Sequence, residues 1–484
     1  MQETTVTKDK KIKDFSSPTP INRESRFDYD ELFFSITDPK STITYANDVF
    51  VRISKYEVDD IVGQLHKLIR HPDMPRSVFY EFWEHLKQNK PVAAYVKNMS
   101  KDGSYYWVMA LAFPCNGGYL SVRLKPGSDQ FKAIKEVYKE VLDHEKQQEA
   151  VSDKKTAMHS SHDLLLSKLN EHGYSSYDEF MWSALQSEME NRESNLGSDG
   201  LLNRHTGDHI PKELLEMEKI LRELVLALGQ LRQIHTSLVG HSDYILKLSR
   251  SVLLLSKNAQ ISSSKLDQQD RSLSVVAEKM GEQSMDGETH LLKMQENIFK
   301  LSELIGGLNF NIISSKLQAE MTKHFLTEIN ETDSAAADQL IPQNKALRLL
   351  YDAFIPKIDL ISSDLGKLPE ALKELLAGVR EIERFLLVLR FIHIKGKVEI
   401  ARMNDESNSF SNTFQELIDE VNSAEQRLEK LGDIIRTHEK TGTLYAGYKG
   451  KLTELGARLK NYRANQTGQT AAKEKNELRS EVAA

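Results

Sequence analysis

Three closely spaced histidines, His159, His162 and His172, are the residues whose type and spacing could support metal chemistry. Imidazole nitrogens are common zinc ligands, but a metal site also needs carboxylates or thiolates at a defining spacing. No such partner accompanies this trio in the sequence. The pattern therefore favours solvated or helix-capping histidines over a metal centre.

The sequence shows no pattern that indicates catalysis. Cys115 is the single cysteine, which excludes an intramolecular disulfide and a cysteine-based zinc cluster and is typical of a reducing compartment. There is no Walker-type phosphate loop, no HExxH, and no Gly-x-Gly-x-x-Gly after a strand. The glycine-rich lid of a histidine kinase is missing too, and paired carboxylates fall on exposed helix faces. We expect no enzymatic activity.

Composition limits the remaining classes of function. The chain has 484 residues, of which 39% are apolar and 28% charged, with a net charge of -7. At roughly 150 residues per domain, about three units are expected. Without a stripe of Lys and Arg, nucleic-acid binding is not indicated. No stretch reaches the ~18 apolar residues of a membrane span, so we expect no membrane insertion and a cytoplasmic location.

Residues 1–27 contain SSPTP, and we expect them to form a flexible leader before the elements that must position any site. Residues 28–126 carry five runs rich in β-branched and aromatic residues, broken by Asp38-Pro39, Lys101-Asp102-Gly103 and Asn116-Gly117-Gly118. They predict a five-stranded antiparallel sheet with short helices. Residues 127–210 form a helical connector and linker, with two helical patches, FKAIKEVYKEVLDHEKQQEAV and SYDEFMWSALQSEMENR.

The remaining sequence has a heptad pattern of apolar residues, which is typical of a coiled-coil seam. Interruptions near residues 266–272 and at ETDSAAADQLIPQ divide it into two antiparallel hairpins, residues 211–330 and 336–463. Each hairpin alone would leave half of its seam exposed, so we expect one four-helix bundle. The periodicity does not distinguish a signal transmitter from a structural spacer. We expect residues 464–484 to form a flexible tail.

The strings ITDPKSTITYANDVFVRIS, IRHPDMP, FYEFWEHLK, VKNMSKDGSYYWV and YLSVR resemble the PAS domain of bacterial aerotaxis receptors. This resemblance covers residues 33–123 and implies an α+β PAS fold. Members of that subfamily hold flavin adenine dinucleotide (FAD) without covalent attachment. The resemblance therefore implies a redox or oxygen sensor, and a flavin needs an apolar slot, polar groups for its ring edge and cations for its pyrophosphate.

The resemblance also implies positions for the flavin-binding residues. Either Tyr106 or Trp107 can face the ligand, because neighbouring strand residues point to opposite sides; we assign Trp107. Plain structural roles stay open for several of these residues, as a turn cap, a core aromatic or a turn amide. The predicted cofactor-binding residues are Asn47, Arg70, His71, Asp73, Trp83, Asn98 and Trp107.

A second resemblance, beginning at Asn258 with NAQISSSKLDQQDRSLSVVAEKM, is to the hairpin tip of methyl-accepting chemotaxis proteins. A fainter copy, KGKVEIARMNDESNSFSNTFQELIDEV, begins at Lys395. The family's tip binds a histidine kinase and a coupling protein, so these proteins, or other receptors, are the implied partners, with a possible homodimer. Both tips are degenerate. The predicted partner-binding residues are Asn258, Ile261, Arg271, Glu399 and Arg402.

Together these observations favour a cytoplasmic sensor of the aerotaxis and chemotaxis receptor type, in which a flavin-binding PAS domain biases a helical signalling bundle. The alternative is a cofactor-free PAS scaffold that organises protein partners or receptor arrays. A third reading places haem in the PAS domain, with His66 or His71 as axial ligand.

Overall fold

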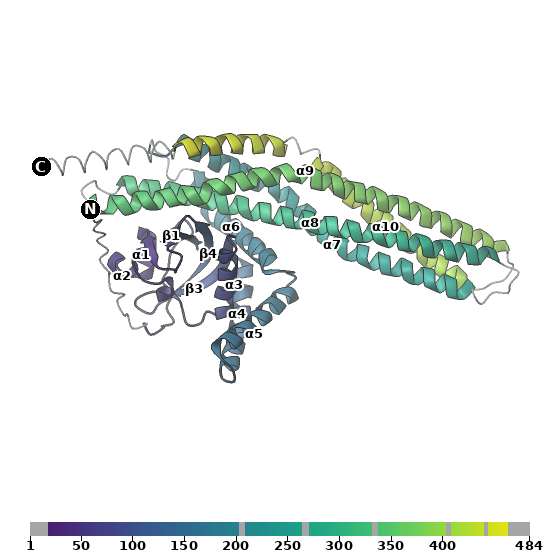
Figure 1. The fold of residues 1–484 in the computed structure, drawn as a ribbon, viewed down its shortest axis with the longest axis horizontal. Coiled ribbons are helices and arrows are strands. Elements are labelled where there is room, and N and C mark those ends of the chain that lie inside the picture. The colour runs from purple at the N-terminus through teal and green to yellow at the C-terminus, as the bar shows by residue number, and fades with distance from the viewer. Residues whose placement is uncertain are drawn as a thin grey trace, which may run out of the picture. The chain divides into compact units, whose positions relative to one another are not determined.

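In the computed structural model, which describes residues 18–202, 209–263, 271–331, 337–402, 408–439 and 444–462, an N-terminal α+β domain precedes long helices (Figure 1). The strands are β1 (Phe33–Thr37), β2 (Ile43–Ala46), β3 (Val92–Met99), β4 (Tyr105–Cys115) and β5 (Gly118–Leu124). Among them lie α1 (Asp48–Ser54), α2 (Val58–Ile61), the 3-10 helix η1 (His66–Ile69) and α3 (Arg76–Lys87). The helices that follow are α4 (Asp129–Glu149), α5 (Lys154–Glu171), α6 (Tyr177–Leu202), α7 (Lys212–Ser263), α8 (Arg271–Glu331), α9 (Ala337–Arg402) and α10 (Asn408–Glu439), and residues 444–462 are also helical.

The five strands form one antiparallel sheet in the order β2-β1-β5-β4-β3, so β5 is the central strand. Asn116 and Gly117 make the turn between β4 and β5, where Gly117 has a φ of +84°. At Gly118 a Cβ atom would lie 1.8 Å from the carbonyl oxygen of Thr37, so β1 can approach β5 only if this residue is glycine. The predicted sheet and its predicted break are confirmed.

The sheet has two faces because alternate residues of each strand point to opposite sides. The inner face lies against α1 and α3: the ring of Phe33 contacts that of Phe50 in α1, at 6.1 Å between centroids. The outer face carries the intervening residues, among them Phe34, whose ring contacts Phe325 of α8 at 5.1 Å. The two aromatic neighbours Phe33 and Phe34 therefore belong to different cores.

Polar contacts also attach helices to the outer face. The Tyr95 hydroxyl of β3 donates to Glu188 of α6 at 2.9 Å, and Glu188 also accepts from the backbone N–H groups of Gly127 and Ser128, before α4. Trp107 of β4 contacts the ring of Phe131 in α4, at 5.4 Å. The connector helices thus contact the strands directly.

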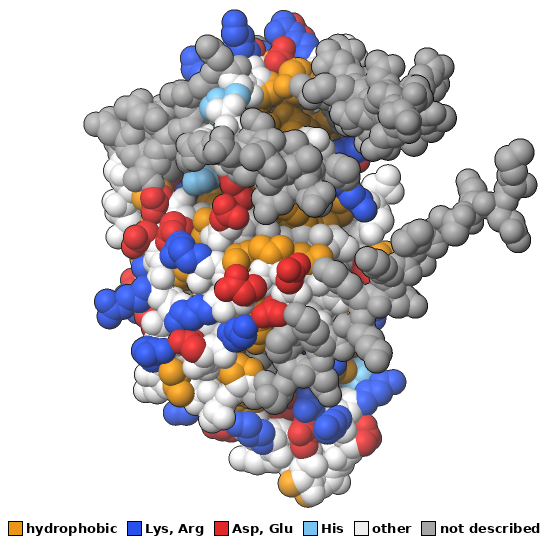
Figure 2. Space-filling view, turned by 90° about the vertical axis from the view of Figure 1, so that its left-hand side faces the viewer, with side chains coloured by type: hydrophobic (Ala, Val, Ile, Leu, Met, Phe, Trp, Pro, Cys, Tyr) orange, Lys and Arg blue, Asp and Glu red, His pale blue; other side chains and the backbone are white. Residues whose placement is uncertain are grey.

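The chain divides into two compact units. The first consists of Met1–Glu223, Asn309–Leu360 and Leu452–Ala484, and the second of Leu224–Leu308 and Ile361–Lys451. The sheet domain and the segment of α8 that covers its outer face therefore belong to one unit. Figure 2 shows Lys and Arg side chains interspersed with Asp and Glu over the described surface in view, without a large patch of one sign.

The second unit consists of long helices that run beside one another in Figure 1. Helices α8 and α9 are antiparallel, because contact positions rise along α8 as they fall along α9. The contacts are Gly287 with Phe385, His290 with Glu381, and Met294 with Gly378. Arg390 of α9 pairs with Glu425 of α10, and Arg427 of α10 lies over the ring of Tyr244 in α7.

Candidate functional site

A cluster of buried polar groups lies on the inner face of the sheet. Arg123 of β5 is 2% exposed, and its Nη2 atom donates to Ser35 Oγ of β1 at 3.1 Å and to His66 Nε2 of η1 at 2.5 Å. Asn98 of β3 and Tyr106 of β4 are cross-strand partners, and both are buried. Because paired residues share a face, the two side chains point to the same side as Arg123.

The charge state of this cluster follows from its burial. Burial, with the nearby Arg123 guanidinium, lowers the pKa of His66 to about 3, so His66 is neutral and its Nε2 atom accepts the hydrogen bond from Arg123. Burial lowers the pKa of Arg123 to about 10, which leaves it protonated at pH 7. Burial also raises the pKa of Tyr106, whose hydroxyl therefore keeps its proton.

Two donors of the cluster are unused. Within the described residues, the Nδ2 atom of Asn98 and the hydroxyl of Tyr106 have no hydrogen-bond partner. Burying an unpaired polar group is costly, so such groups often mark a place where a ligand or water completes the bonding. The nearby inner-face residues are apolar: Val96 faces Val108 and Ala94 faces Ala110 across β3 and β4, and the ring of Phe33 lies 6.2 Å from that of Tyr106. An apolar lining with a few polar groups is the kind of surface that a heteroaromatic ligand needs.

The predicted Arg70, His71 and Asp73 lie beside this cluster, at the end of β3. A backbone bridge joins Arg70 to Asn98, and the backbone N–H of His71 donates to the carbonyl oxygen of Lys97 at 3.3 Å. His71 is 3% exposed; burial, with Lys97 nearby, lowers its pKa to about 4, and its Nδ1 atom accepts from the backbone of Asp73 at 3.1 Å. Asp73 is half-exposed and pairs with Lys97 at 2.7 Å.

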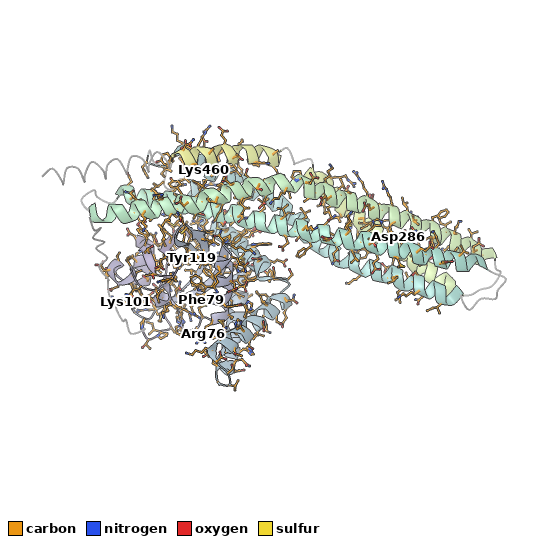
Figure 3. All side chains as sticks on the ribbon, viewed as in Figure 1. Arg76, Phe79, Lys101, Tyr119, Asp286 and Lys460 are labelled. Atoms are coloured by element: carbon orange, nitrogen blue, oxygen red, sulfur yellow. The ribbon has the colours of Figure 1, made fainter. Side chains whose placement is uncertain are left out.

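The Arg70 guanidinium is held inside the domain. It lies 4.0 Å from the ring centroid of Phe79 in α3 and donates to the carbonyl oxygen of Met74 at 3.1 Å. Burial lowers the pKa of Arg70 to about 10, so it stays a cation at neutral pH. Phe79 is labelled in Figure 3. Arg70 therefore presents a second positive charge on the helical side of the domain.

Asn47 has a structural function in this fold. Its Oδ1 atom accepts from the backbone N–H groups of Phe34 and Phe50, at 3.0 and 3.4 Å, and its Nδ2 donates to the carbonyl oxygen of Leu32. It thereby caps α1 and fixes the end of β2. This is the structural role of a side-chain amide in a turn, which was the alternative to flavin binding.

The two predicted tryptophans occupy different environments. Trp83 of α3 is half-buried and makes an edge contact with Tyr119 of β5, at 5.3 Å between centroids. Trp107 lies on the outer face, against Phe131, while Tyr106 lies on the inner face with Arg123. Of the adjacent pair, Tyr106 rather than the assigned Trp107 is therefore among the inner polar groups.

Arg123 was not among the residues predicted from the sequence, and Tyr106 was set aside there in favour of Trp107. His66 was considered only as a haem ligand. The signal for Arg123 was a cation inside the β5 string YLSVRL, flanked by the buried Val122 and Leu124. Because β5 pairs with a strand on each side, a cation in it can be covered by helices on either face of the sheet.

The other chemistry-bearing residues lie elsewhere. His162 of α5 contacts Glu81 of α3 at 2.5 Å, His159 lies against the ring of Tyr80, and His172 is the C-cap of α5. Within the described residues, no group of three or more His, Cys, Asp or Glu side chains is placed to hold a metal ion.

The predicted partner-binding tips fall partly outside the described residues, which omit 264–270 and 403–407. Asn258 and Ile261 are exposed near the end of α7, and Glu399 is half-buried on α9. Arg271 begins α8 and Arg402 ends α9, but the positions of their side chains are outside the described structure. Their roles stay predictions.

Comparison with known proteins identifies the class of domain. Residues 43–120 match the family described as PAS fold. The chain is 40% identical over 115 residues to the aerotaxis receptor of Escherichia coli strain K12, an alignment that covers 23% of each protein. It is 29% identical over 82 residues to the biofilm dispersion protein BdlA of Pseudomonas aeruginosa, covering 17% of this chain and 20% of that protein. The chain therefore contains a PAS domain and has an aerotaxis receptor and BdlA as homologues.

These matches span less than a quarter of each of these two relatives. Among solved structures, the light-state blue-light photoreceptor Aureochrome1 LOV shares 21% identity with a TM-score of 0.20, covering 21% of this chain and 86% of that one. The long helices after the PAS domain are consistent with a signalling region. No described helix combines the length and apolar character needed to cross a membrane.

Proposed function

We propose that this protein is a non-catalytic, cytoplasmic sensor whose PAS domain binds a flavin, FAD in particular, on the inner face of the sheet. The observation that carries the proposal is the pair of unused buried donors, Asn98 Nδ2 and the Tyr106 hydroxyl. The 40% identity to an aerotaxis receptor over 115 residues supports it. A bound flavin would supply reversible redox chemistry, and the chain's own residues would read its state.

The residues present fit such a ligand. Asn98 and Tyr106 would donate to the polar edge of the ring, and Ala94 and Ala110 would pack against its plane. Arg70, beside Asn98, is a cation suited to a phosphate group. Each of these side chains is held by β3, β4 or the segment joined to β3, which places them on rigid elements.

A change at the inner face would reach the helices through the strands themselves. Tyr106 and Trp107 are adjacent in β4, and Trp107 packs on Phe131 of α4. In β3, Tyr95 is hydrogen-bonded to Glu188 of α6. A ligand can shift the position of these helices only if its two states bind with different affinity to the two conformations. The donors at Asn98 and Tyr106 provide contacts that would differ between an oxidised and a reduced ring.

We propose that the helical region passes this state to signalling proteins at the hairpin tips. A chemotaxis-type histidine kinase and coupling protein, or other receptors, are the candidate partners. Exposed Asn258 and Ile261 lie where the chemoreceptor-like sequence begins. A homodimer remains part of this proposal.

The experiment is an absorption spectrum of the purified full-length chain, followed by heat release and identification of any chromophore. A flavin spectrum, with FAD in the released fraction, would support the proposal. A protein that stays colourless after incubation with excess FAD would contradict it and favour the cofactor-free scaffold. A haem spectrum would point to His66 or His71, although the His66 Nε2 and His71 Nδ1 lone pairs already accept hydrogen bonds.

A further inference from the structure

Arg123 is a buried cation. It lies in the central strand, is 2% exposed, and forms no ion pair with an acidic residue in the described part of the chain. Its hydrogen-bond acceptors are the neutral groups Ser35 Oγ, His66 Nε2 and the carbonyl oxygen of Ser121. Burying a charge is costly unless an opposite charge compensates it. The described residues around Arg123 do not supply that opposite charge.

The immediate surroundings hold this guanidinium in one place. It lies 5.8 Å from the ring centroid of Phe33 and 5.1 Å from that of Phe50, so aromatic faces flank it. His66 must offer its Nε2 lone pair to accept the bond from Arg123, which fixes the imidazole as the tautomer protonated at Nδ1. A protonated His66 would repel Arg123, so the pair carries a single positive charge.

The single positive charge of the buried Arg123 indicates which kind of anionic group it could neutralise. A pyrophosphate carries two negative charges and is usually met by several cations, whereas Arg123 is one enclosed guanidinium. The reduced ring of a flavin that has taken up two electrons and one proton carries one negative charge at its pyrimidine edge. The neighbouring donors, Asn98 and Tyr106, also suit a ring edge. Charge near that edge is one way in which proteins tune a flavin.

We propose that Arg123 lies against the electron-rich edge of the flavin ring and selectively stabilises its anionic reduced form, and that His66 is the positioning residue that holds the guanidinium there. This inference rests on the proposed flavin-binding function. It assigns the sensitivity of the sensor, meaning the potential at which it responds, to one residue pair.

The first measurement uses the wild-type full-length chain loaded with FAD. Anaerobic titration with dithionite, which supplies two electrons per flavin, gives the midpoint potential at a series of pH values. If the reduced ring stays anionic, one proton accompanies two electrons and the potential falls by about 30 mV per pH unit. We expect this slope to persist below the pH at which free reduced flavin takes up its second proton. A slope of about 59 mV per pH unit in that range would overturn the inference.

The second measurement compares variants. Arg123→Met removes the charge and should weaken binding of reduced FAD at least tenfold more than that of oxidised FAD, which lowers the midpoint potential by about 30 mV or more. Arg123→Lys keeps the charge and should retain most of the potential. His66→Gln offers an acceptor oxygen and should resemble wild type, whereas His66→Leu should lower the potential. Lys125→Met is the control, because Lys125 lies over the rings of Phe27 and Tyr29 instead.

The outcomes separate this inference from the proposed function. A wild-type chain that binds no flavin contradicts the proposed function. A chain that binds FAD, but whose potential is unchanged in Arg123→Met, contradicts only the inference. Riboflavin tests the location: if the Arg123→Met effect disappears with this phosphate-free ligand, Arg123 contacts the phosphates and the ring-edge assignment is wrong. If Arg123→Met does not fold, the pH slope of the wild type and the Arg123→Lys potential decide.

Discussion

The Nε2 atom of His85 in α3 lies 2.8 Å from the Oδ1 atom of Asp178 in the first turn of α6, which ties a helix of the PAS domain to the connector. Burial alone would lower the pKa of His85, but the hydrogen bonds to Asp178 and to the Glu81 carbonyl, with both carboxylates nearby, raise it above its usual value. Lys90, His162 and Tyr177 complete its charged and aromatic surroundings.

A raised pKa in the folded state makes this contact pH-dependent. Its contribution to stability is fully present below the pKa of an unfolded histidine, about 6.5, and is lost as the pH rises through the higher folded value. We therefore expect His85→Gln to lower the free energy of unfolding by about 1 kcal/mol at mildly acidic pH and by less in alkaline solution. Urea unfolding at both pH values measures this, with the exposed C-cap variant His172→Gln as control. An equal loss at both pH values would show that only packing was removed.

The aromatic contact of α8 with the outer face should contribute strongly to the stability of the first unit. Phe325 is fully buried, with its ring centroid 5.1 Å from that of Phe34 and 5.4 Å from that of Tyr45. Truncating a buried phenylalanine leaves a cavity, so Phe325→Ala should cost about 3–5 kcal/mol of unfolding free energy.

A matched control lies on the same helix. Phe299 is 60% exposed, so Phe299→Ala should change the unfolding free energy by less than about 0.5 kcal/mol. Chemical denaturation followed by near-ultraviolet circular dichroism measures both. Similar effects of the two substitutions would mean that α8 does not cover the sheet.

Much of the sheet domain could be predicted because its signals are local. The strands are rich in β-branched and aromatic residues, and Asn116-Gly117 breaks β4 from β5 at the predicted place. The alternation rule predicted that Tyr106 and Trp107 face opposite sides, but it gave no means to choose between them. That choice depends on which helices cover which face, and α4 follows the sheet in sequence.

Long-range contacts explain what the sequence could not reveal. Phe325 covers Phe34 from a position far along the chain, where the heptad pattern suggested only packing among helices. The polar stretch between the two predicted helical patches forms α5, which begins at the Asp153 cap and contacts α3 through His162. Arg123 escaped detection because composition rules place cations at the surface.

Because Lys357 of α9 is buried, the first unit should be more stable at alkaline than at neutral pH. Burial lowers the pKa of its amine, whose Nζ atom lies 2.8 Å from the ring centroid of Phe113 and donates to Gln318 Oε1 at 3.0 Å. Because the unfolded chain binds a proton that the folded chain excludes, unfolding free energy rises with pH up to about 10, the unfolded pKa.

Replacing this buried amine by an apolar side chain should therefore be stabilising at neutral pH. We expect Lys357→Met to raise the unfolding free energy by about 1–3 kcal/mol at pH 7, with a gain that shrinks toward pH 10. The control is Lys345→Met, an exposed position on the same helix. Urea titrations across this pH range measure the difference, and a pH-independent gain would show that Lys357 has the same protonation state in the folded and unfolded chain.

The carboxylate of Glu188 is the acceptor for four donors, which makes it the main polar connection between the sheet and α6. The donors are the Ser128 hydroxyl, the backbone N–H groups of Gly127 and Ser128, and the Tyr95 hydroxyl. Glu188→Gln replaces one oxygen with a donor and leaves buried donors unpaired, at a cost of about 1–3 kcal/mol. The control is Glu190→Gln, an exposed position two residues further along the same helix, which should be nearly neutral. Differential scanning calorimetry distinguishes them, and equal melting temperatures would contradict the buried network.

The adjacent pair Tyr106 and Trp107 gives the most direct test of which face binds the ligand. The Tyr106 hydroxyl is buried without a partner in the described structure, so Tyr106→Phe should leave the ligand-free protein as stable as wild type or slightly more so. If that hydroxyl donates to a flavin, the same substitution should weaken FAD binding by about three- to tenfold, equivalent to about 0.5–1.5 kcal/mol. Trp107→Phe alters the outer face against Phe131 and should leave the FAD dissociation constant unchanged. Fluorescence titration with FAD measures both variants, and the reverse ranking would place the ligand on the outer face of the sheet.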